Sequence, residues 1–355
     1  MSLDPPPARL SWSLVVATYA RHDILTTSVT LAARQSRPPA EVVIVDGSPD
    51  WEVGRERVRA ALADAGFEGR LRYEPALKLG SCTQRNQAVR HASGDVLFVL
   101  DDDSLLFPDA AARIMAAYEC DTDAQIVGLG LVHVEQPPPG SGLPVPVPAA
   151  ARGRRERARR ALARLSWRGA GYFLPYDRQF PAHPLPGGCA GLDLRPVRLL
   201  DGFRMTFRRS VFDALAFDEM LERYAVSEDQ DFSYRASRLG ALAEVVGAGV
   251  HHAVAGAGRL PRRTVTTLQW CNQTALRAVH GTGRGRALAR LALAVPFRLA
   301  VYALQDAVDA DPTFPRVAGT LQAVPSCVRL LTLPPARVPE VYRGLQARVL
   351  AAAAR

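Results

Sequence analysis

The stretch Asp95-Val-Leu-Phe-Val-Leu-Asp101-Asp102-Asp103 decides the fold. Residues 96–100 are all apolar, which is typical of a strand buried on both faces. In an open α/β sheet, ligands bind at the carboxyl ends of the strands, where these aspartates stand. Three adjacent carboxylates repel one another, and a divalent cation with a bound phosphate relieves that repulsion. A solvated acidic turn or the start of a helix is the alternative interpretation.

The rest of the chain predicts more strands and helices around this one. Apolar runs predict strands at residues 13–17, 41–45, 71–74, 125–132 and 243–250, and helices are expected at 23–35, 52–65, 80–91, after Pro108 and at 227–240. Strands that alternate with helices favour parallel pairing, because each crossover helix returns the chain to the same end of the sheet. The predicted fold class is therefore α/β.

Composition and charge indicate which kinds of partner the protein binds. The chain has 355 residues, 48% hydrophobic and 22% charged, with a formal net charge of +9 that arginine supplies almost alone. Such a charge suits nucleic acid, anionic lipid or phosphorylated substrates. No helix-turn-helix, zinc-finger or aromatic-basic pattern accompanies it, so we expect no nucleic-acid partner.

The cysteines and the N-terminus bear on the compartment. The five cysteines are scattered and none forms a C-x-x-C pair: Cys82, Cys120, Cys189, Cys271 and Cys327. This spacing argues against a disulfide framework or a zinc site and favours a reducing compartment. Residues 1–10 are Pro-rich and lack the apolar core of a signal peptide, so the expected localisation is cytoplasmic.

Two domains are predicted, at residues 1–260 and 261–355, the second mainly helical. Within the first, 134–198 is an excursion rich in Pro, Gly and Arg. Its arginine-rich part, 151–168, is either an amphipathic helix at a membrane surface or a solvated helix with one packed face. The apolar segment 287–309 is interrupted by arginines and a proline and is predicted to be too broken to span a membrane. Two alternatives remain for this segment: it docks on the bilayer interface, or it packs against the rest of the protein. The first alternative predicts peripheral contact with the inner membrane face.

Polar residues follow the carboxyl ends of successive predicted strands. These residues are Thr18, Asp46, the three aspartates 101–103, His251 and His252, with Arg85 on a nearby helix. Each has an ordinary explanation by itself, such as a turn residue for Asp46 or a surface helix residue for Arg85. Several polar groups that converge on one edge of a sheet indicate a binding site.

The ordered set of motifs resembles the inverting glycosyltransferases of the GT-A "family 2" group. The matching stretches, in order between about residues 11 and 252, are Val16-Ala-Thr-Tyr19, Val45-Asp-Gly-Ser48, Gly80-Ser-Cys-Thr-Gln-Arg-Asn86, Gly94-Asp95 leading to Asp101–Asp103, Gly202-Phe-Arg-Met-Thr-Phe-Arg208, Glu228-Asp229 with Asp231, and His251-His252. Ala17 and Ala20 depart from the usual proline and asparagine, away from the chemistry. The resemblance implies a GT-A, nucleotide-diphospho-sugar transferase fold. This fold has a Rossmann-like, mixed but mostly parallel sheet flanked by helices, here with a helical C-terminal extension.

The resemblance also implies roles for the nucleotide-sugar side of the site. Thr18, Tyr19 and Asp46 would hold the nucleoside, with Asp46 as an acceptor for a base N–H. Arg85 would lie by the base or the phosphates. Asp101 and Asp102 would face the ribose and the sugar.

The remaining implied roles are metal binding and proton transfer. Asp103 of the Asp-x-Asp (DXD) pattern would bind Mn²⁺ or Mg²⁺, with His251 or His252 completing the shell. Carboxylates suit these cations better than imidazole does. An inverting transfer needs one carboxylate to take the proton of the acceptor hydroxyl. Asp229 is the choice for this base, with Glu228 and Asp231 as competitors.

The implied partners are a nucleotide-diphosphate sugar and a glycan, glycolipid or small-molecule acceptor. From its position before the Gly202 motif, the excursion 134–198 is expected to lie on the acceptor side and to select the acceptor. The basic and apolar segments favour a lipid-linked or cell-envelope acceptor, as in polysaccharide biosynthesis. The oligomeric state stays open. A sugar-nucleotide nucleotidyltransferase is the enzymatic alternative, but it needs a Gly-rich loop after the first strand. A dehydrogenase needs G-x-G-x-x-G, which is missing there. A non-catalytic nucleotide-binding protein at the membrane is the third alternative.

Overall fold

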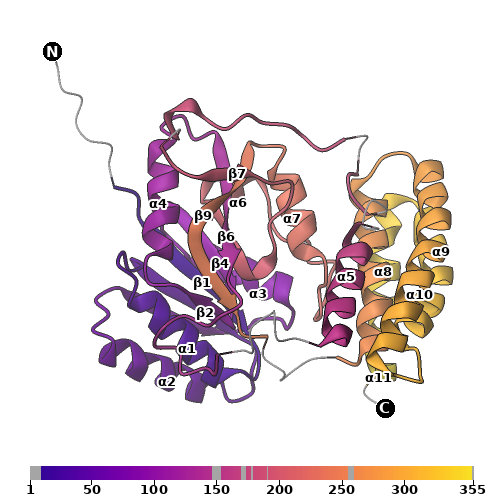
Figure 1. Ribbon diagram of the computed structural model, residues 1–355, viewed down its shortest axis with the longest axis horizontal. Coiled ribbons are helices and arrows are strands. Elements are labelled where there is room, and N and C mark those ends of the chain that lie inside the picture. Colours follow the sequence, from indigo (N-terminus) through magenta and orange to yellow (C-terminus); the bar gives the residue numbers. More distant parts are fainter. Residues whose placement is uncertain are drawn as a thin grey trace. The chain divides into compact units, whose positions relative to one another are not determined.

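The computed structural model describes residues 9–145, 153–168, 173–176, 179–189, 191–254 and 260–353. The chain forms two compact units, coloured along the sequence in Figure 1. The sheet unit comprises Met1–Pro146, Pro181–Glu219 and Glu228–Gly258, and the helical unit comprises Val147–Phe180, Met220–Ser227 and Arg259–Arg355. Two segments that fall inside the predicted 1–260 domain thus group with the C-terminal helices, and the domain division stays a prediction.

Within the described ranges, nine strands form one mixed sheet. They are β1 (Trp12–Thr18), β2 (Glu41–Asp46), β3 (Arg70–Pro75), β4 (Val96–Asp101), β5 (Ser104–Leu106), β6 (Ile126–His133), β7 (Leu194–Pro196), β8 (Met205–Arg208) and β9 (Ala241–His252). The order is β3-β2-β1-β4-β8-β6-β9-β5, and β7 pairs with β9. The first four strands of this order are parallel, while β8 is antiparallel to both of its neighbours. The predicted mixed, mostly parallel α/β sheet is confirmed.

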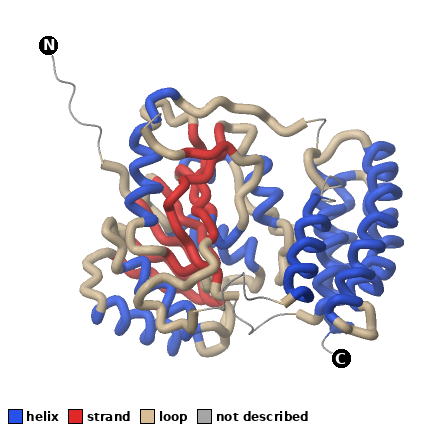
Figure 2. Tube along the Cα trace, viewed as in Figure 1, coloured by secondary structure: helices blue, strands red, loops and turns tan. Residues whose placement is uncertain are grey.

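Helices cover the sheet, as the blue tubes around the red strands in Figure 2 show. The sheet unit contains α1 (His22–Ala33), α2 (Trp51–Asp64), α3 (Ser81–His91), α4 (Ala110–Cys120), α6 (Ser210–Ala214), α7 (Glu228–Ala236) and the short helices η3 (Gly187–Cys189) and η4 (Gly202–Arg204). Successive residues of β4 from Val96 to Val99 are fully buried, because the strand packs on both faces. This is why its sequence is a continuous apolar run.

The register of the sheet brings the strand ends together. Thr18 of β1 pairs with Asp46 of β2, and Ala17 pairs with Asp101 of β4. Since β8 runs antiparallel to β4, the turn η4 that precedes β8 lies at the same edge. The parallel arrangement therefore gathers the predicted polar groups at one edge of the sheet.

The helical unit contains α5 (Arg154–Arg168), α8 (Arg262–His280), α9 (Arg284–Asp309), α10 (Pro315–Thr332), η5 (Pro335–Arg337) and α11 (Val338–Ala353). Helix α9 runs unbroken through Pro296 and is long and apolar enough to cross a membrane. The prediction that this segment is too broken for that length is wrong. A single proline removes only one backbone N–H donor, and Arg298, one of the charges counted as an interruption, is buried.

A disulfide joins Cys120 at the end of α4 to Cys189 in η3, with 5.5 Å between their Cα atoms. Cys82, Cys271 and Cys327 are buried free thiols. The sequence spacing did not predict this pair, because the two cysteines are 69 positions apart. The argument for a reducing compartment from scattered cysteines therefore loses its basis.

Candidate active site

Asp101 ends β4, Asp102 and Asp103 form the turn to β5, and the latter two are buried. The side chains of Asp102 and Asp103 are 5% and 2% exposed, whereas that of Asp101 is 32% exposed. A solvated acidic turn would expose all three. Carboxylates are buried only where partners compensate their charge, so the turn is a built site rather than a surface loop.

Asp102 is held by β1 and by the start of α1. Thr18 Oγ1 donates a hydrogen bond to Asp102 Oδ2 at 2.8 Å, and Arg21 Nη1 donates to Oδ1 at 3.0 Å. Arg21 also lies 3.7 Å from Asp103 Oδ2. Burial raises the pKa of Asp102 to about 6, with Arg21 opposing that rise and the Asp103 carboxylate adding to it. Sequence reasoning missed Arg21, although an arginine three positions after Thr18 was a usable signal.

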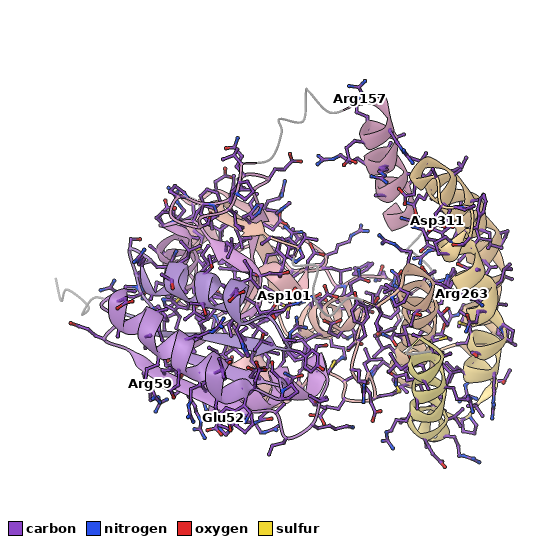
Figure 3. The ribbon with its side chains drawn as sticks, turned by 90° about the horizontal axis from the view of Figure 1, so that it is seen from below. Glu52, Arg59, Asp101, Arg157, Arg263 and Asp311 are labelled. Carbon is purple, nitrogen blue, oxygen red and sulfur yellow. A yellow bond between two sulfur atoms is a disulfide. The ribbon has the colours of Figure 1, made fainter. Side chains whose placement is uncertain are left out.

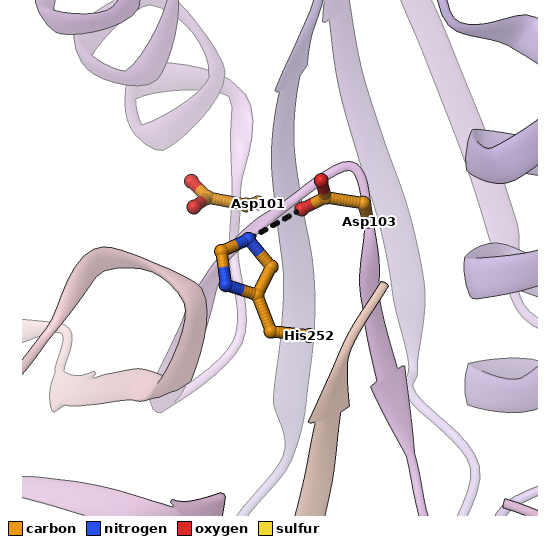
Figure 4. Close-up of side chains that lie close together, drawn as sticks. All are labelled: Asp101, Asp103 and His252. Carbon is orange, nitrogen blue, oxygen red and sulfur yellow. Dashed lines mark ion pairs between the residues drawn. The ribbon is translucent and has the colours of Figure 1, made fainter. Parts of the chain in front are cut away.

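Asp101, Asp103 and His252 form a group that fits a divalent cation (Figure 4). Each offers one ligand atom, and these atoms all lie within 4.8 Å of one another. His252 Nε2 lies 3.1 Å from Asp103 Oδ1, and the His252 ring stacks on Phe203 with centroids 4.6 Å apart. Two carboxylates suit Mn²⁺ or Mg²⁺, and one imidazole can accompany them.

The two predicted histidines differ in what they face. His251 Nδ1 is hydrogen-bonded to the backbone carbonyl of Val134 at 3.0 Å. Its neighbour His252 belongs to the acidic group described above, and His251 does not. Alternation along β9 explains the difference, because successive side chains of a strand point to opposite faces.

Arg85 on α3 connects the acidic turn to α7. Its Nη2 donates to Asp101 Oδ1 at 2.5 Å and its Nη1 donates to Glu228 Oε1 at 2.7 Å. The guanidinium also lies over the ring of Phe217, 5.5 Å from the centroid. Burial lowers the pKa of Arg85, but Asp101 and Glu228 outweigh this and raise it, so the side chain stays charged.

Asp229 is fixed by backbone donors next to this ion pair. Gly202 N donates to Asp229 Oδ2 at 2.9 Å, and Gln230 N donates to Oδ1 at 2.8 Å. Burial, reinforced by the Glu228 carboxylate, raises the pKa of Asp229 to about 8. Position 202 has little room for a side chain, since a Cβ there would lie 3.2 Å from Arg85 Nη2. The close approach of Gly202 therefore explains the glycine at the start of η4.

The two predicted competitors for the base are already paired. Glu228 is bound to Arg85, as described above. Asp231 is buried and accepts hydrogen bonds from Arg235 on the same helix, the shorter at 2.6 Å. Asp229 thus differs from both, because backbone N–H groups rather than a guanidinium hold it.

The carboxylate of Asp46 has four hydrogen-bond partners, all from the sheet unit. Ser48 N and Ser48 Oγ bind Oδ1 at 2.8 and 2.5 Å, while Tyr73 Oη and His22 Nε2 lie 2.6 and 2.9 Å from Oδ2. A carboxylate has about four acceptor sites, so these donors occupy them all. A base N–H would have to displace one of the four. Tyr19, by contrast, is 48% exposed beside the end of β1.

The comparisons with known proteins show which family the first half of the chain resembles. The sequence model of "Glycosyl transferase family 2" matches residues 13–179, which include β1 to β6 and the three aspartates. This region is similar to the family 2 glycosyltransferases, and the sheet has the fold of the GT-A glycosyltransferases. Glu228, Asp229 and His252 lie outside the matched range. No curated protein sequence matches the chain.

Two solved structures are similar to the chain, and the first one described here supports the fold. A mannosyltransferase from Pyrobaculum calidifontis, in complex with GDP-Man and Mn²⁺, is 18% identical, with a TM-score of 0.52 over 99% of this chain and 88% of that one. S. aureus TarS 1–349 in complex with UDP-GlcNAc is 14% identical, with a TM-score of 0.48 over 96% of this chain and 89% of that one. At such identities the first likeness shows the fold alone.

Proposed function

We propose that the protein transfers a sugar from a nucleotide-diphosphate donor to an acceptor hydroxyl with inversion at the anomeric carbon, and that Asp229 is the general base. One observation carries this proposal. Arg85 joins Asp101 of the cation-binding group to Glu228, the residue next to Asp229. The candidate base and the candidate metal ligands therefore belong to one site.

The donor would bind at the carboxyl edge of the sheet. Asp101, Asp103 and His252 would hold Mn²⁺ or Mg²⁺, and Arg21 would stabilise the neighbouring carboxylates. The cation, when bound, supplies Lewis-acid stabilisation of the diphosphate oxygens. Tyr19 offers an exposed aromatic ring beside this edge, a suitable surface for a nucleoside base.

The acceptor hydroxyl would attack the anomeric carbon while Asp229 takes its proton. The new bond uses an electron pair of the hydroxyl oxygen. The bond from the anomeric carbon to the phosphate oxygen breaks, and its pair leaves with the nucleoside diphosphate. Asp229 is the one of the three candidates that is not paired with an arginine, and burial raises its pKa to about 8, so it holds the proton that it takes. A base must be ionised to act, so the reaction is favoured at neutral to alkaline pH.

A donor screen tests the function. Uridine, thymidine and guanosine diphosphate sugars are incubated with the full chain and Mn²⁺ or Mg²⁺, and the released nucleoside diphosphate is measured. We expect one donor class to release its nucleoside diphosphate slowly, by hydrolysis, when no acceptor is present. The release should be faster, by sugar transfer, when a suitable alcohol is added. The anomeric configuration of the product, read by NMR, should be opposite to that of the donor. Retention of configuration, or release of pyrophosphate from a nucleoside triphosphate and a sugar phosphate, would overturn the proposal.

Matched variants sharpen the screen. Asp229→Asn should lose transfer, whereas Asp123→Asn should keep it. Asp123 is an exposed carboxylate in the turn after α4, outside the site. Equal loss in both variants would indicate a general effect of removing acidic charge rather than the loss of a base.

A further inference from the structure

The outer face of α9 is an apolar stripe. Its exposed residues between positions 289 and 307 are all uncharged: Ala289, Ala292, Leu293, Pro296, Phe297, Ala300, Leu304 and Ala307. Their spacing of three and four places them on one side of the helix. Leu293, Phe297 and Leu304 are 75%, 42% and 55% exposed. A contiguous apolar face of this length marks an interaction surface.

The opposite face of α9 binds the rest of the helical unit through polar groups. Arg298 is buried, lies 5.0 Å from the centroid of the Trp270 ring and donates to Tyr302 Oη at 3.3 Å. Asp306 is buried and pairs with Arg316 of α10 at 2.6 Å. If α9 crossed a bilayer, it would leave these partners and carry two charges into lipid, which is costly. The helix therefore suits a position on a membrane surface, not a position across it.

Charge is distributed unequally between the two units. The residues of the helical unit include 24 arginines and seven Asp or Glu, a formal charge of +17. The whole chain carries +9, so the sheet unit carries −8. Figure 3 labels two of the exposed arginines of the helical unit, Arg157 on α5 and Arg263 on α8.

The basic helix α5 packs beside α9. Arg159 Nε lies 2.5 Å from Asp309 Oδ1, and Arg155 Nε donates to the carbonyl of Val308 at 2.5 Å. Both contacts are at the C-terminal end of α9. The arginine-rich helix and the helix with the apolar stripe are thus neighbours, and basic residues next to an exposed apolar face are typical of surfaces that bind anionic lipid.

We propose that the helical unit docks on an anionic lipid bilayer, with the apolar stripe of α9 inserted at the interface and the arginines of α5 on the headgroups. A second copy of the chain is a poorer occupant, because two units of +17 repel each other. A neutral surface would offer no anionic groups to the arginines of α5. This inference does not depend on the chemistry proposed for the sheet unit.

Vesicle sedimentation with the full chain tests the proposal. Vesicles of phosphatidylcholine with or without phosphatidylglycerol are used at low and high salt. We expect the protein to bind the anionic vesicles and to bind the neutral ones at least about tenfold more weakly. Binding to the anionic vesicles should be lost as the salt concentration rises. No binding to phosphatidylglycerol vesicles at low salt, or binding that is unaffected by lipid charge, would overturn the proposal.

Two variants locate the surface. Leu293→Asp with Phe297→Asp should weaken vesicle binding about tenfold or more, because each removes inserted apolar area. The control Val53→Asp changes an exposed apolar residue on α2 of the sheet unit and should bind as the wild type does. Circular dichroism establishes that each variant is folded. Undiminished binding of the α9 variant, or a dimer in ultracentrifugation that this variant abolishes, would count against the lipid assignment.

Discussion

Arg85 on α3 and Glu228 on α7 form a buried ion pair, with 2.7 Å between Nη1 and Oε1, although they are 143 positions apart. The side chains are 5% and 13% exposed. This pair links the helix that follows β3 to the helix that carries the candidate base. Its loss should therefore affect both stability and catalysis.

Arg85→Gln is expected to destabilise the protein by about 3–5 kcal/mol, because Glu228 would be left as a buried charge without its partner. Adding Glu228→Gln to the Arg85→Gln variant should restore part of the lost free energy of unfolding. Urea unfolding of the two single variants and the double variant gives the coupling. Strictly additive free energies of unfolding would contradict the pairing.

Asp229→Asn should reduce kcat by about 10²–10⁴-fold, the usual contribution of a general base. In the wild type, kcat/KM should rise with pH and level off above about 8, because the pKa of Asp229 is raised to about 8. Rate measurements from pH 5 to pH 10 give this profile. A variant that keeps the wild-type rate, or a profile that is flat between pH 6 and 9, would exclude Asp229 as the base.

The same pKa predicts how stability depends on pH. The folded state binds the Asp229 proton more tightly than the unfolded chain does, since the ordinary pKa of Asp is about 3.9. This contribution to stability is present at acidic pH and is lost as pH rises toward 8. Asp229→Asn should therefore gain stability relative to the wild type as pH rises, which thermal unfolding at pH 5 and pH 8 can measure. If Asp229→Asn were more stable than the wild type at pH 5 but not at pH 8, the raised pKa of Asp229 would be contradicted.

The disulfide makes a separate prediction. A bond between Cys120 and Cys189 closes a loop with a sequence separation of 69, for which chain entropy gives about 4 kcal/mol. Dithiothreitol should lower the unfolding temperature of the wild type and leave that of the double variant Cys120→Ser, Cys189→Ser unchanged. Thiol titration of the unfolded, unreduced protein should find three free cysteines. Five free thiols would show that the bond does not form.

The central parallel strands β1, β2 and β4 were predictable, because a strand that is buried on both faces has a continuous run of apolar residues. The strand predicted at 96–100 corresponds to Val96–Asp101, and the one at 41–45 corresponds to Glu41–Asp46. The three-residue strand Ser104–Leu106 and the antiparallel place of β8 were not predictable. Short strands carry no periodic signal, and pairing direction depends on contacts between distant segments.

Within the site, the residue types were predictable and their pairings were not. The aspartates stand out by their number, but the partners of Asp46 come from three separate segments, through His22, Ser48 and Tyr73. Likewise nothing in the sequence separates His251 from His252, because only the alternation along β9 decides which ring reaches Asp103. Long-range contacts of this kind are a property of the fold.

The central claim is that Asp101, Asp103 and His252 bind a divalent cation together with a nucleoside diphosphate. Isothermal titration of a nucleoside diphosphate into the protein, with Mn²⁺ or with a chelator, measures this directly. We predict binding that requires the cation, is lost in Asp103→Asn and is retained in Asp123→Asn. Binding of equal strength in the chelator, or an Asp103→Asn variant that binds as the wild type does, would contradict the account.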